Sequence, residues 1–331
     1  MKNAFISNIW KNSSLNFISK ILIFIAIVFV LDICVGSCLR YFYFRQQNGF
    51  LFRTTFAIEK TRADLLIFGS SKANHQYSPE IFGNKMGLSY YNAGRDGCSI
   101  FYHYAVLRSV LKRYTPKVII LDISRDFEKK QDSYDRISIL LPYYKDHPEM
   151  RAIIEMKSPY EKFKLVSKIY PFNSLLFSIF AGNSDLNKNR YTDNGGYVPL
   201  TKIWTGKLSV INEPINYKLD STKILIYESF IEDCLKAGVR LFVVSSPDFV
   251  KYNYQEKSNI VAEQFAKKHN IKFLNYSNNS VFLNNSKYFA DGSHLNDYGA
   301  KIFSRLIVND IEKDSTINNA KNNDDGLIEG E

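Results

Sequence analysis

The hydrophobic and polar positions after residue 62 alternate between short apolar runs and longer amphipathic stretches. The short runs predict strands, because four to eight consecutive apolar residues suit a strand buried on both faces of a parallel sheet. The predicted strands are 64–68, 88–92, 117–123, 239–244 and 271–275. The longer stretches predict helices over 78–86, 99–113, 221–237, 252–269 and 297–311. This alternation favours an α/β fold, a three-layer doubly wound parallel sheet with helices on both faces.

The alternation of strands and helices lapses between about residues 128 and 220. This stretch is rich in Tyr, Asn, Ser and Lys, and it holds most of the prolines together with Asn194-Gly195-Gly196. We interpret it as a mainly helical insertion followed by loops, within a domain that covers residues 63–311. The final residues, 312–331, are polar and rich in Asn and Asp, which predicts a disordered tail.

A long apolar run lies close to the N-terminus, at residues 21–39 between Lys20 and Arg40. Its nineteen residues extend over roughly 28 Å at the helical rise, about the thickness of the hydrocarbon core of a bilayer. The run therefore predicts a transmembrane helix within a membrane anchor at residues 1–40. A basic, aromatic stalk is expected to follow at residues 41–62.

Asp32 is the one charged residue within the apolar run. An intramembrane carboxylate is typical of a contact with another membrane helix, but a position near the interface, reached by snorkelling, is the interpretation favoured here. A cleaved segment is a further alternative, because Val35-Gly36-Ser37-Cys38 loosely resembles a lipoprotein cleavage box. The roughly twenty residues ahead of the run are long for the charged leader of a signal peptide. We therefore predict an uncleaved single anchor.

The composition predicts a packed core and an uneven distribution of charge. Of 331 residues, 45% are hydrophobic, which excludes an intrinsically disordered protein. The formal net charge is +10, and residues 1–62 account for +6 of it, with eight Lys and Arg against Asp32 and Glu59. A basic region beside an apolar segment indicates a membrane surface, and we expect no nucleic-acid partner.

The four cysteines indicate neither a metal site nor a disulfide framework. Cys34 and Cys38 fall within the apolar run, while Cys98 and Cys234 are far apart and outside any Cys-x-x-Cys pattern. We interpret the latter two as small buried hydrophobic residues. The sequence predicts no cofactor and no metal.

The strongest candidate for chemistry lies where the first predicted strand ends, at Gly69-Ser70-Ser71. Ligands of doubly wound sheets bind beyond the carboxyl ends of the strands, so a hydroxyl placed there can act as a nucleophile. A serine nucleophile needs a base and a group that orients the base. His294 lies ahead of the last predicted helix, and Asp291 precedes it by three positions, so a turn can bring the carboxylate to Nδ1 and leave Nε2 for Ser71. We expect His75 to point away from Ser71. We interpret His103, His147 and His269 as surface or packing residues.

Three segments of the chain together resemble the SGNH (GDSL-like) hydrolase superfamily. They are Gly69-Ser70-Ser71 after the first strand, Asn92-Ala93-Gly94-Arg95-Asp96-Gly97 after the second, and Asp291-Gly292-Ser293-His294-Leu295-Asn296 with Gly299-Ala300 before the last helix. The resemblance covers about residues 63–127 and 222–311. The chain looks most similar to membrane-anchored bacterial members, including proteins linked to acylation of cell-envelope polymers. This resemblance implies a flavodoxin-like SGNH fold.

The resemblance also implies roles for individual residues. Ser71 matches the family's nucleophile, and Asp291 and His294 match the acid and the base of its last block. The backbone N–H of Ser71 and that of a glycine in the second block bind the oxyanion in that family. The glycine maps best to Gly97, with Gly94 as the alternative.

The third block departs from the family pattern. The family carries an asparagine after the third strand, whereas residues 121–126 read Leu-Asp-Ile-Ser-Arg-Asp. Ser124 or Asn74 could donate the missing hydrogen bond instead. Loss of one oxyanion donor costs roughly 3 kcal/mol of transition-state stabilisation, which lowers activity without abolishing it.

The residues and the resemblance lead to one expected function and one alternative. The expected function is a membrane-anchored SGNH-type serine esterase or O-acyltransferase that acts, through an acyl-enzyme, on an acylated cell-envelope glycan or similar polymer. A membrane acyltransferase is a candidate partner. The expected location is the inner (cytoplasmic) membrane of a bacterium, with a single span and an extracytoplasmic, periplasmic domain. The alternative is a catalytically weak or inactive SGNH-fold scaffold or glycan-binding subunit of a polysaccharide modification system, which the missing asparagine motivates.

Overall fold

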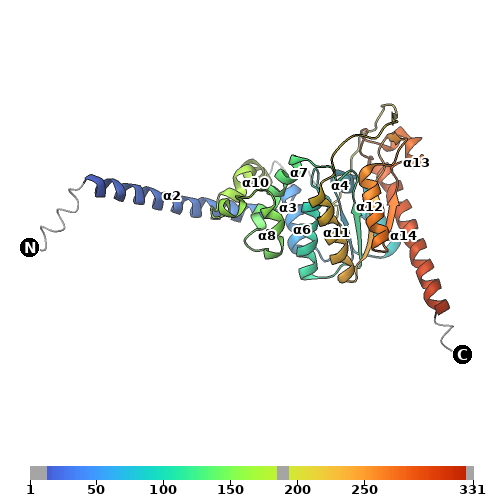
Figure 1. Ribbon diagram of the computed structural model, residues 1–331, viewed down its shortest axis with the longest axis horizontal. Helices are drawn as coiled ribbons and strands as arrows, with labels where there is room; N and C mark the ends of the chain where they lie inside the picture. Colours follow the sequence, from blue (N-terminus) through green and yellow to red (C-terminus); the bar gives the residue numbers. More distant parts are fainter. Residues whose placement is uncertain (1–12, 185–193, 326–331) are drawn as a thin grey trace, which may run out of the picture.

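The computed structural model describes residues 13–184 and 194–325, and its centre is a five-stranded parallel sheet. The order of the strands is β2-β1-β3-β5-β7. Their bounds are β1 (Leu65–Phe68), β2 (Tyr90–Asn92), β3 (Val118–Asp122), β5 (Arg240–Ser245) and β7 (Lys272–Asn275). Every predicted strand coincides with one of these five, so the predicted α/β class with a parallel sheet is confirmed. Figure 1 shows this domain between two projecting helices, one near each terminus.

β1 lies inside the sheet although it is the first strand of the chain. Leu65 pairs with Tyr90 of β2 on one side and with Val118 of β3 on the other, and the chain then continues outward from β3 to β5 and β7. The strand order therefore reverses direction between β1 and β3, as in doubly wound sheets. Ligands of such sheets bind in the crevice beyond the carboxyl ends of the strands at this reversal.

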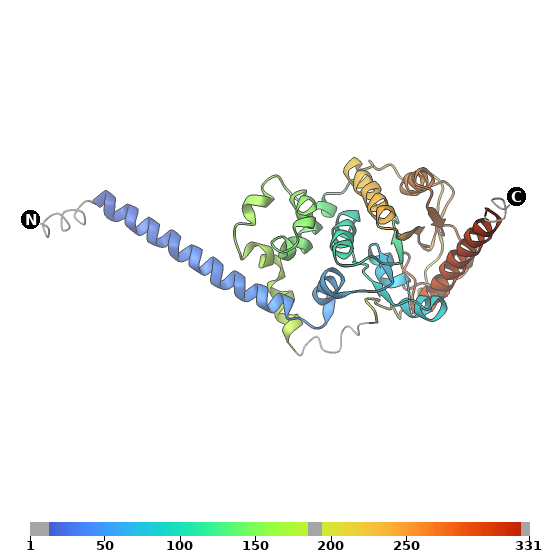
Figure 2. The same ribbon diagram turned by 90° about the horizontal axis from the view of Figure 1, so that it is seen from below.

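Helices cover both faces of the sheet (Figure 2). Leu66 and Phe68 of β1 face one cluster of buried residues, and Leu65 and Ile67 face the other. The first cluster includes α6 (Ile100–Arg113), α11 (Ser221–Lys236) and α12 (Lys257–Lys268), and the second includes α4 (Ser71–Gln76), α5 (Pro79–Met86), α13 (Ser280–Leu283) and α14 (Asp297–Asp325). All positions of β1 and β3 are buried, which explains why these strands are almost unbroken apolar runs in the sequence.

Two boundaries in the C-terminal half differ from the sequence-based prediction. The predicted helix at 252–269 begins only at Lys257, because Glu256 is its N-cap and accepts a hydrogen bond from the N–H of Ser258. Ahead of it, β6 (Val250–Tyr252) pairs in parallel with β4 (Ser209–Ile211) in a separate two-stranded sheet.

The tail predicted to be disordered from residue 312 instead continues α14 as far as Asp325. The sequence contains no Gly or Pro between Ala300 and Asp325 that would end the helix, and extending an existing helix is easier than starting one. Residues 326–331 of the predicted tail lie outside the described residues.

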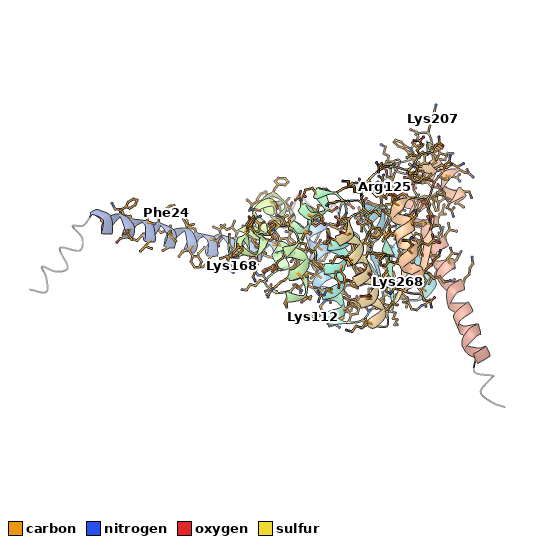
Figure 3. All side chains as sticks on the ribbon, viewed as in Figure 1. Phe24, Lys112, Arg125, Lys168, Lys207 and Lys268 are labelled. Atoms are coloured by element: carbon orange, nitrogen blue, oxygen red, sulfur yellow. The ribbon has the colours of Figure 1, made fainter. Side chains whose placement is uncertain are left out.

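α2 (Ser13–Phe44) is one continuous helix that projects from the domain (Figures 1 and 2). It is long and apolar enough to cross a membrane, and the candidate span is Asn16–Phe44. The apolar run at residues 21–39 lies within this span, and Figure 3 labels Phe24 on its projecting part. Residues 1–12 of the predicted anchor lie outside the described part of the chain.

Residues 41–62 are folded onto the domain and do not form the predicted stalk. After α2 the chain forms α3 (Gly49–Thr55) and the π-helical turn η1 (Phe56–Lys60). Tyr43, Leu51 and Ile58 are buried in the same cluster as α6. The prediction is wrong because the partners of these side chains lie far along the chain, as in the edge-to-face contact of Tyr43 with Tyr143.

One face of α2 binds the insertion at three positions spaced one helical turn apart, Asp32, Gly36 and Arg40. The Asp32 carboxylate accepts three hydrogen bonds, from Ser167 Oγ (2.5 Å), the N–H of Lys168 (2.7 Å) and the N–H of Ile169 (3.2 Å). A Cβ on Gly36 would lie 2.4 Å from the backbone of Lys168, and Arg40 forms an ion pair with Asp146. Asp32 therefore has partners within this chain, which neither sequence-based interpretation of it included.

Among the described residues, the segment between β3 and α11 is helical as far as Asn183, and from residue 194 to 220 it contains β4 and no helix. Its elements are α7 (Gln131–Asp135), η2 (Arg136–Tyr143), η3 (Pro148–Met150), α8 (Arg151–Glu155), α9 (Glu161–Lys164), η4 (Tyr170–Leu175), α10 (Leu176–Asn183) and β4. Ile137, Tyr143, Met150 and Ile153 are buried in the cluster that α6 and α11 share. The helical part is thus integral to the core, and it lies between the sheet and α2 (Figures 1 and 2).

Candidate active site

The turn after β1 places Ser71 at the carboxyl edge of the sheet. Ser70 is the N-cap of α4, and Ser71 is the first residue of that helix. Gly69, which precedes them, has a φ of +143°, and a Cβ there would lie 2.8 Å from the Cβ of Asp122 in β3. Glycine alone suits both this conformation and this close approach. Gly69 therefore allows the strand to turn directly into a helix that begins with the serine.

Ser71, His294 and Asp291 form one hydrogen-bonded chain. Ser71 Oγ lies 2.8 Å from His294 Nε2, and His294 Nδ1 lies 3.0 Å and 3.1 Å from the two carboxylate oxygens of Asp291. The loop that carries His294 and Asp291 joins η6 (Ser286–Tyr288) to α14, and a hydrogen bond from the N–H of Ala290 to the carbonyl of His294 closes it. The structure thus brings together the three residues that the sequence singled out.

Asp291 is held so that it can orient the imidazole. Its Oδ1 accepts hydrogen bonds from the N–H groups of Ser293 (2.7 Å) and His294 (2.9 Å). Burial raises the pKa of Asp291, but these hydrogen bonds and the one to the His294 ring outweigh burial and hold the pKa below its usual value. A charged Asp291 favours a proton on Nδ1 of His294, which leaves Nε2 to accept the Ser71 hydroxyl proton.

Gln76 fastens the histidine loop to the helix that carries Ser71. Its side chain is fully buried, and Nε2 donates a hydrogen bond to the carbonyl of Ser293 (3.0 Å). α4 therefore supplies both the serine and the residue that fixes the backbone beside His294. The sequence-based analysis did not single out Gln76.

A second histidine–carboxylate pair lies beside the first. The rings of His75 and His294 are 5.7 Å apart, edge to face. His75 Nδ1 lies 2.7 Å from the carbonyl of Val198, and Nε2 lies 3.3 Å from the carboxylate of Asp96. The expectation that His75 points elsewhere is wrong, because Ser71 and His75 are four positions apart on α4 and so share a face. That spacing was the signal that could have identified it.

The electrostatics of this second pair favour its charged form. Burial lowers the pKa of His75, but the hydrogen bond and charge of Asp96 and the Val198 carbonyl outweigh burial and raise the pKa above its usual value. Burial likewise raises the pKa of Asp96, but the interactions with His75, with Asn74 and with Arg53 lower it to about 2. A positive charge on His75 therefore persists to a higher pH than on a free histidine.

Two of the predicted oxyanion donors are engaged elsewhere. The N–H of Gly94 donates to Asn92 Oδ1 (2.9 Å). The Asn74 amide donates from Nδ2 to Asp96 (2.6 Å) and accepts at Oδ1 from Arg53 (2.7 Å). The structure therefore leaves neither group free to replace the asparagine that residues 121–126 lack.

The other two candidates, Gly97 and Ser124, make no hydrogen bond to Ser71 in the described structure, and each is held in its own surroundings. Gly97 has a φ of +68° in the loop between β2 and α6, and a Cβ there would lie 2.5 Å from the guanidinium carbon of Arg136. Ser124 Oγ is enclosed and has no hydrogen-bond partner among the described residues. The N–H of Ser71 belongs to the first turn of α4, where helical N–H groups lack a partner within the helix.

A buried polar cluster lies below the turn that carries Ser71. The Tyr77 hydroxyl donates to the Asp122 carboxylate (2.6 Å), and Ser246 Oγ hydrogen-bonds the same carboxylate. Burial raises the pKa of Tyr77 far above its usual value, so its hydroxyl stays protonated. Lys72 of α4 forms an ion pair with Asp248 (3.5 Å). These contacts tie α4 to the carboxyl ends of β3 and β5 and make the position of Ser71 rigid.

A cavity of about 410 Å³ has His75 in its lining, and the His75 ring is 5.7 Å from that of His294. Three guanidinium groups line it, with Asp96 as the one carboxylate among its lining residues. The full lining is Phe50, Arg53, Asn74, His75, Arg95, Asp96, Arg136, Ile139 and Val198. The cavity and the Ser71–His294 pair thus share a wall.

One group of carboxylates and imidazole in the described part of the chain is close enough to hold a metal ion. It consists of Glu228 and Glu232 on α11 and His269, the C-cap of α12. Lys268 already pairs with Glu228, so the group has a cation and we assign it no metal.

No protein-family model matches the chain, and no curated protein matches it at a significant level.

Proposed function

We propose that this protein is a membrane-anchored serine esterase or O-acyltransferase of the SGNH type that acts on an acylated cell-envelope glycan or similar polymer. One observation carries the proposal: Ser71, His294 and Asp291 are joined by hydrogen bonds of 2.8 to 3.1 Å at the carboxyl edge of a doubly wound sheet. The strand order matches the flavodoxin-like order expected of an SGNH fold. The polymer itself is inferred from the sequence resemblance alone.

The first half of the reaction forms an acyl-enzyme. Ser71 Oγ attacks the carbonyl carbon of the ester while its proton passes to His294 Nε2, and Asp291 stabilises the resulting imidazolium through Nδ1–H. The N–H groups of Ser71 and Gly97 bind the negative oxygen of the tetrahedral intermediate. The bond between the acyl carbon and the leaving oxygen then breaks, and the leaving alcohol takes its proton from His294 Nε2.

The second half returns the enzyme to its starting state. Water or a sugar hydroxyl attacks the acyl carbon and gives its proton to His294 Nε2. The bond to Ser71 Oγ breaks, and Oγ recovers the proton from the imidazolium. Attack by water gives an esterase and attack by a sugar hydroxyl gives an O-acyltransferase, so the acceptor alone decides between the two activities.

A serine-reactive fluorophosphonate probe on the detergent-purified full chain tests the proposal. Wild type should be labelled, Ser71→Ala should not, and Ser70→Ala should be labelled as a matched control. Absence of labelling in wild type, or equal labelling of Ser71→Ala, would contradict the proposed nucleophile.

A second candidate function is a scaffold or glycan-binding subunit with weak or no catalysis. The observation that favours it is the engagement of the Asn74 side chain with Asp96 and Arg53, so that Asn74 does not replace the asparagine that residues 121–126 lack. A folded wild-type protein that resists the probe yet binds envelope glycan would support this function over the enzyme.

The membrane anchor in this proposal is α2, and the domain is placed on the extracytoplasmic side of a bacterial inner membrane. Phosphatase and cytoplasmic reporter fusions after residue 62 test the side. An active phosphatase supports the proposed orientation, whereas an active cytoplasmic reporter at the same position opposes it.

A further inference from the structure

The cavity beside His75 has an excess of positive charge that its own residues do not neutralise. Arg136 pairs with Asp132 (2.8 Å), but in the described part of the chain no salt bridge joins Arg53 or Arg95 to a carboxylate. Asp96, the one carboxylate in the lining, is bound by His75 and Asn74. Three guanidinium groups thus face one carboxylate in the lining, so the cavity carries more positive than negative charge.

Uncharged groups hold the side chains of Arg53 and Arg95 in place. Arg53 Nη1 donates to Asn74 Oδ1 (2.7 Å) and to the carbonyl of Gly196 (2.8 Å), while its Nε is buried without a partner. Arg95 Nη1 donates to the carbonyl of Phe50 (2.8 Å), and its guanidinium stacks over the Phe50 ring. Burial lowers the pKa of Arg53, and the charge of Arg95 lowers it further. An anion between the two would relieve this repulsion.

We propose that the cavity binds an anionic group of the substrate, a carboxylate or a phosphate carried by the polymer whose ester reacts at Ser71. This inference rests on the proposed function and names its substrate class. Guanidinium groups match both anions in geometry, and a volume of about 410 Å³ suits a small-ligand site. Because the ring of His75, a lining residue, is 5.7 Å from that of His294, an anion bound in the cavity would place a neighbouring ester near the serine.

Binding can be measured without turnover in the full-length Ser71→Ala protein by calorimetry. The probes are trigalacturonic acid for carboxylate, glycerol 3-phosphate for phosphate and maltotriose as the neutral control. Arg95→Gln and Arg136→Gln should each weaken the binding of the anionic probe about tenfold or more, since a hydrogen bond to a charged group is lost. Arg108→Gln on α6, outside the cavity lining, should leave binding unchanged.

The probe that binds more tightly identifies the anion as carboxylate or phosphate. Three results would overturn the inference. They are no binding of either anionic probe at millimolar concentration, binding of maltotriose as tight as that of the anionic probes, or a loss of affinity below twofold in the arginine variants. Ester turnover by wild type is measured separately. Anion binding without turnover would refute the proposed enzyme and leave the anion site standing.

A second inference comes from an independent feature, the exposed apolar side chains of the insertion next to α2. Six of them fall between residues 160 and 180 and are 50% to 82% exposed: Tyr160, Phe163, Val166, Leu176, Phe177 and Phe180. We call these six residues the apolar edge. Lys162, Lys164 and Lys168 are exposed among them, a mixture typical of surfaces that lie in a membrane interface.

The apolar edge reaches the apolar part of α2 at Val166, and α10, which carries Leu176, Phe177 and Phe180, also contacts α2. Val166 and Ser167 line a groove of about 420 Å³ together with Phe24, Val28 and Asp32 of α2. Figure 3 shows Lys168 where α2 meets the domain. If α2 spans a membrane, the insertion therefore extends along α2 as far as apolar residues of α2 that lie within the membrane.

The length of α2 leads to the same conclusion. Eleven residues, 21–31, separate Lys20 from Asp32, and at the helical rise they extend over roughly 17 Å. The hydrocarbon core of a bilayer is about 30 Å thick, and Asp32 is already bound by the insertion. A helix that spans the membrane must therefore bring the docked insertion partly into it.

We infer that the apolar edge lies in the boundary between headgroups and acyl chains of the membrane that α2 spans. This inference rests on α2 being the membrane anchor, as in the proposed function. The full chain, with Cys34→Ser and Cys38→Ser, is labelled with the fluorophore NBD at Phe177→Cys and reconstituted into phosphatidylcholine–phosphatidylglycerol vesicles with doxyl-labelled lipid. Cys98 and Cys234 are buried and burial raises the pKa of both thiols, so they should not react.

Lipid quenching should reach the label at Phe177→Cys and also at Val28→Cys on α2, but not at Tyr298→Cys, an exposed position on α14. Quenching at Val28→Cys without quenching at Phe177→Cys would overturn the inference and keep the anchor. Absence of quenching at Val28→Cys would refute the anchor and the inference with it.

Discussion

Ser71 Oγ and His294 Nε2 lie 2.8 Å apart although 223 positions separate the two residues. The local sequence around either residue alone is not enough to bring the two together. It arises because Gly69 turns β1 into α4 at the carboxyl edge, while Gln76 fastens the loop of His294 to the same helix. The contact is therefore a property of the whole sheet, and its consequences can be tested one residue at a time.

Ser71→Ala, His294→Ala and the double variant should lose activity to nearly the same level, by roughly 10⁴-fold or more in kcat/KM. Residues that act as one unit are strongly non-additive, because either loss alone removes covalent catalysis. Turnover of a chromogenic acetyl ester measures this, with Ser70→Ala as the matched control. Losses that multiply in the double variant would mean that the two residues do not work together.

Asp291→Asn should lose activity too, but less than Ser71→Ala. The variant removes the charge that favours Nδ1–H on His294, whereas the base and the nucleophile remain. We expect a loss of roughly 10² to 10⁴-fold in kcat, with a smaller change in KM. Equal activity of Asp291→Asn and wild type would show that the carboxylate only closes the loop through the N–H groups of Ser293 and His294.

The His75–Asp96 pair should stabilise the fold within a limited pH range. The folded pKa of His75 is raised, so its contribution is present below the usual pKa of about 6.5 and is lost as pH rises through the folded pKa. The pKa of Asp96 is lowered to about 2, so its contribution is present above about pH 4 and is lost as pH falls toward 2. The pair therefore acts most fully from about pH 4 to 6.5.

His75→Gln tests this range by thermal unfolding. Because the Asp96 side chain is 58% exposed, solvent screening limits the expected loss to about 1 kcal/mol or less near pH 5. The difference from wild type should shrink as pH is raised well above 6.5, through the raised pKa of folded His75. A difference that is constant across this range would mean that packing, and not the charged pair, is responsible.

The central sheet and the Ser71, Asp291 and His294 positions could be predicted because their signals are local. A strand buried on both faces, such as β1, is a continuous apolar run, and each site residue lies in a short motif next to a strand or helix. β4 and β6 could not be found in this way, since each has three residues and neither is fully buried. The roles of Tyr43 and Asp32 were also hidden, because their partners lie 100 and 135 positions further along the chain.

Asp32→Ala should loosen the junction between α2 and the insertion. The carboxylate accepts three hydrogen bonds from residues 167–169, and hydrogen bonds to charged groups contribute about 1.5–3 kcal/mol where they are sheltered from water. We expect a loss of about 1–2 kcal/mol and faster proteolysis near residue 167 in the detergent-solubilised full chain. Asp32→Asn keeps an acceptor and should lose less, and equal proteolysis of all three proteins would contradict the junction.

The insertion should prove essential to the fold, although its sequence suggests a removable segment. Ile137, Tyr143 and Ile153 are buried against the same cluster as α6, so deletion of residues 135–215 should leave the remaining chain insoluble.

A sharper test compares two isoleucines of the insertion. Ile153→Ala, at a position that is 1% exposed, should cost about 2–4 kcal/mol, whereas Ile203→Ala, at a position that is 61% exposed, should cost less than about 0.5 kcal/mol. Urea unfolding of the two variants, followed by circular dichroism of the whole domain, measures both. If Ile153→Ala left the main transition unchanged, the insertion would unfold separately and the sheet would have a core of its own.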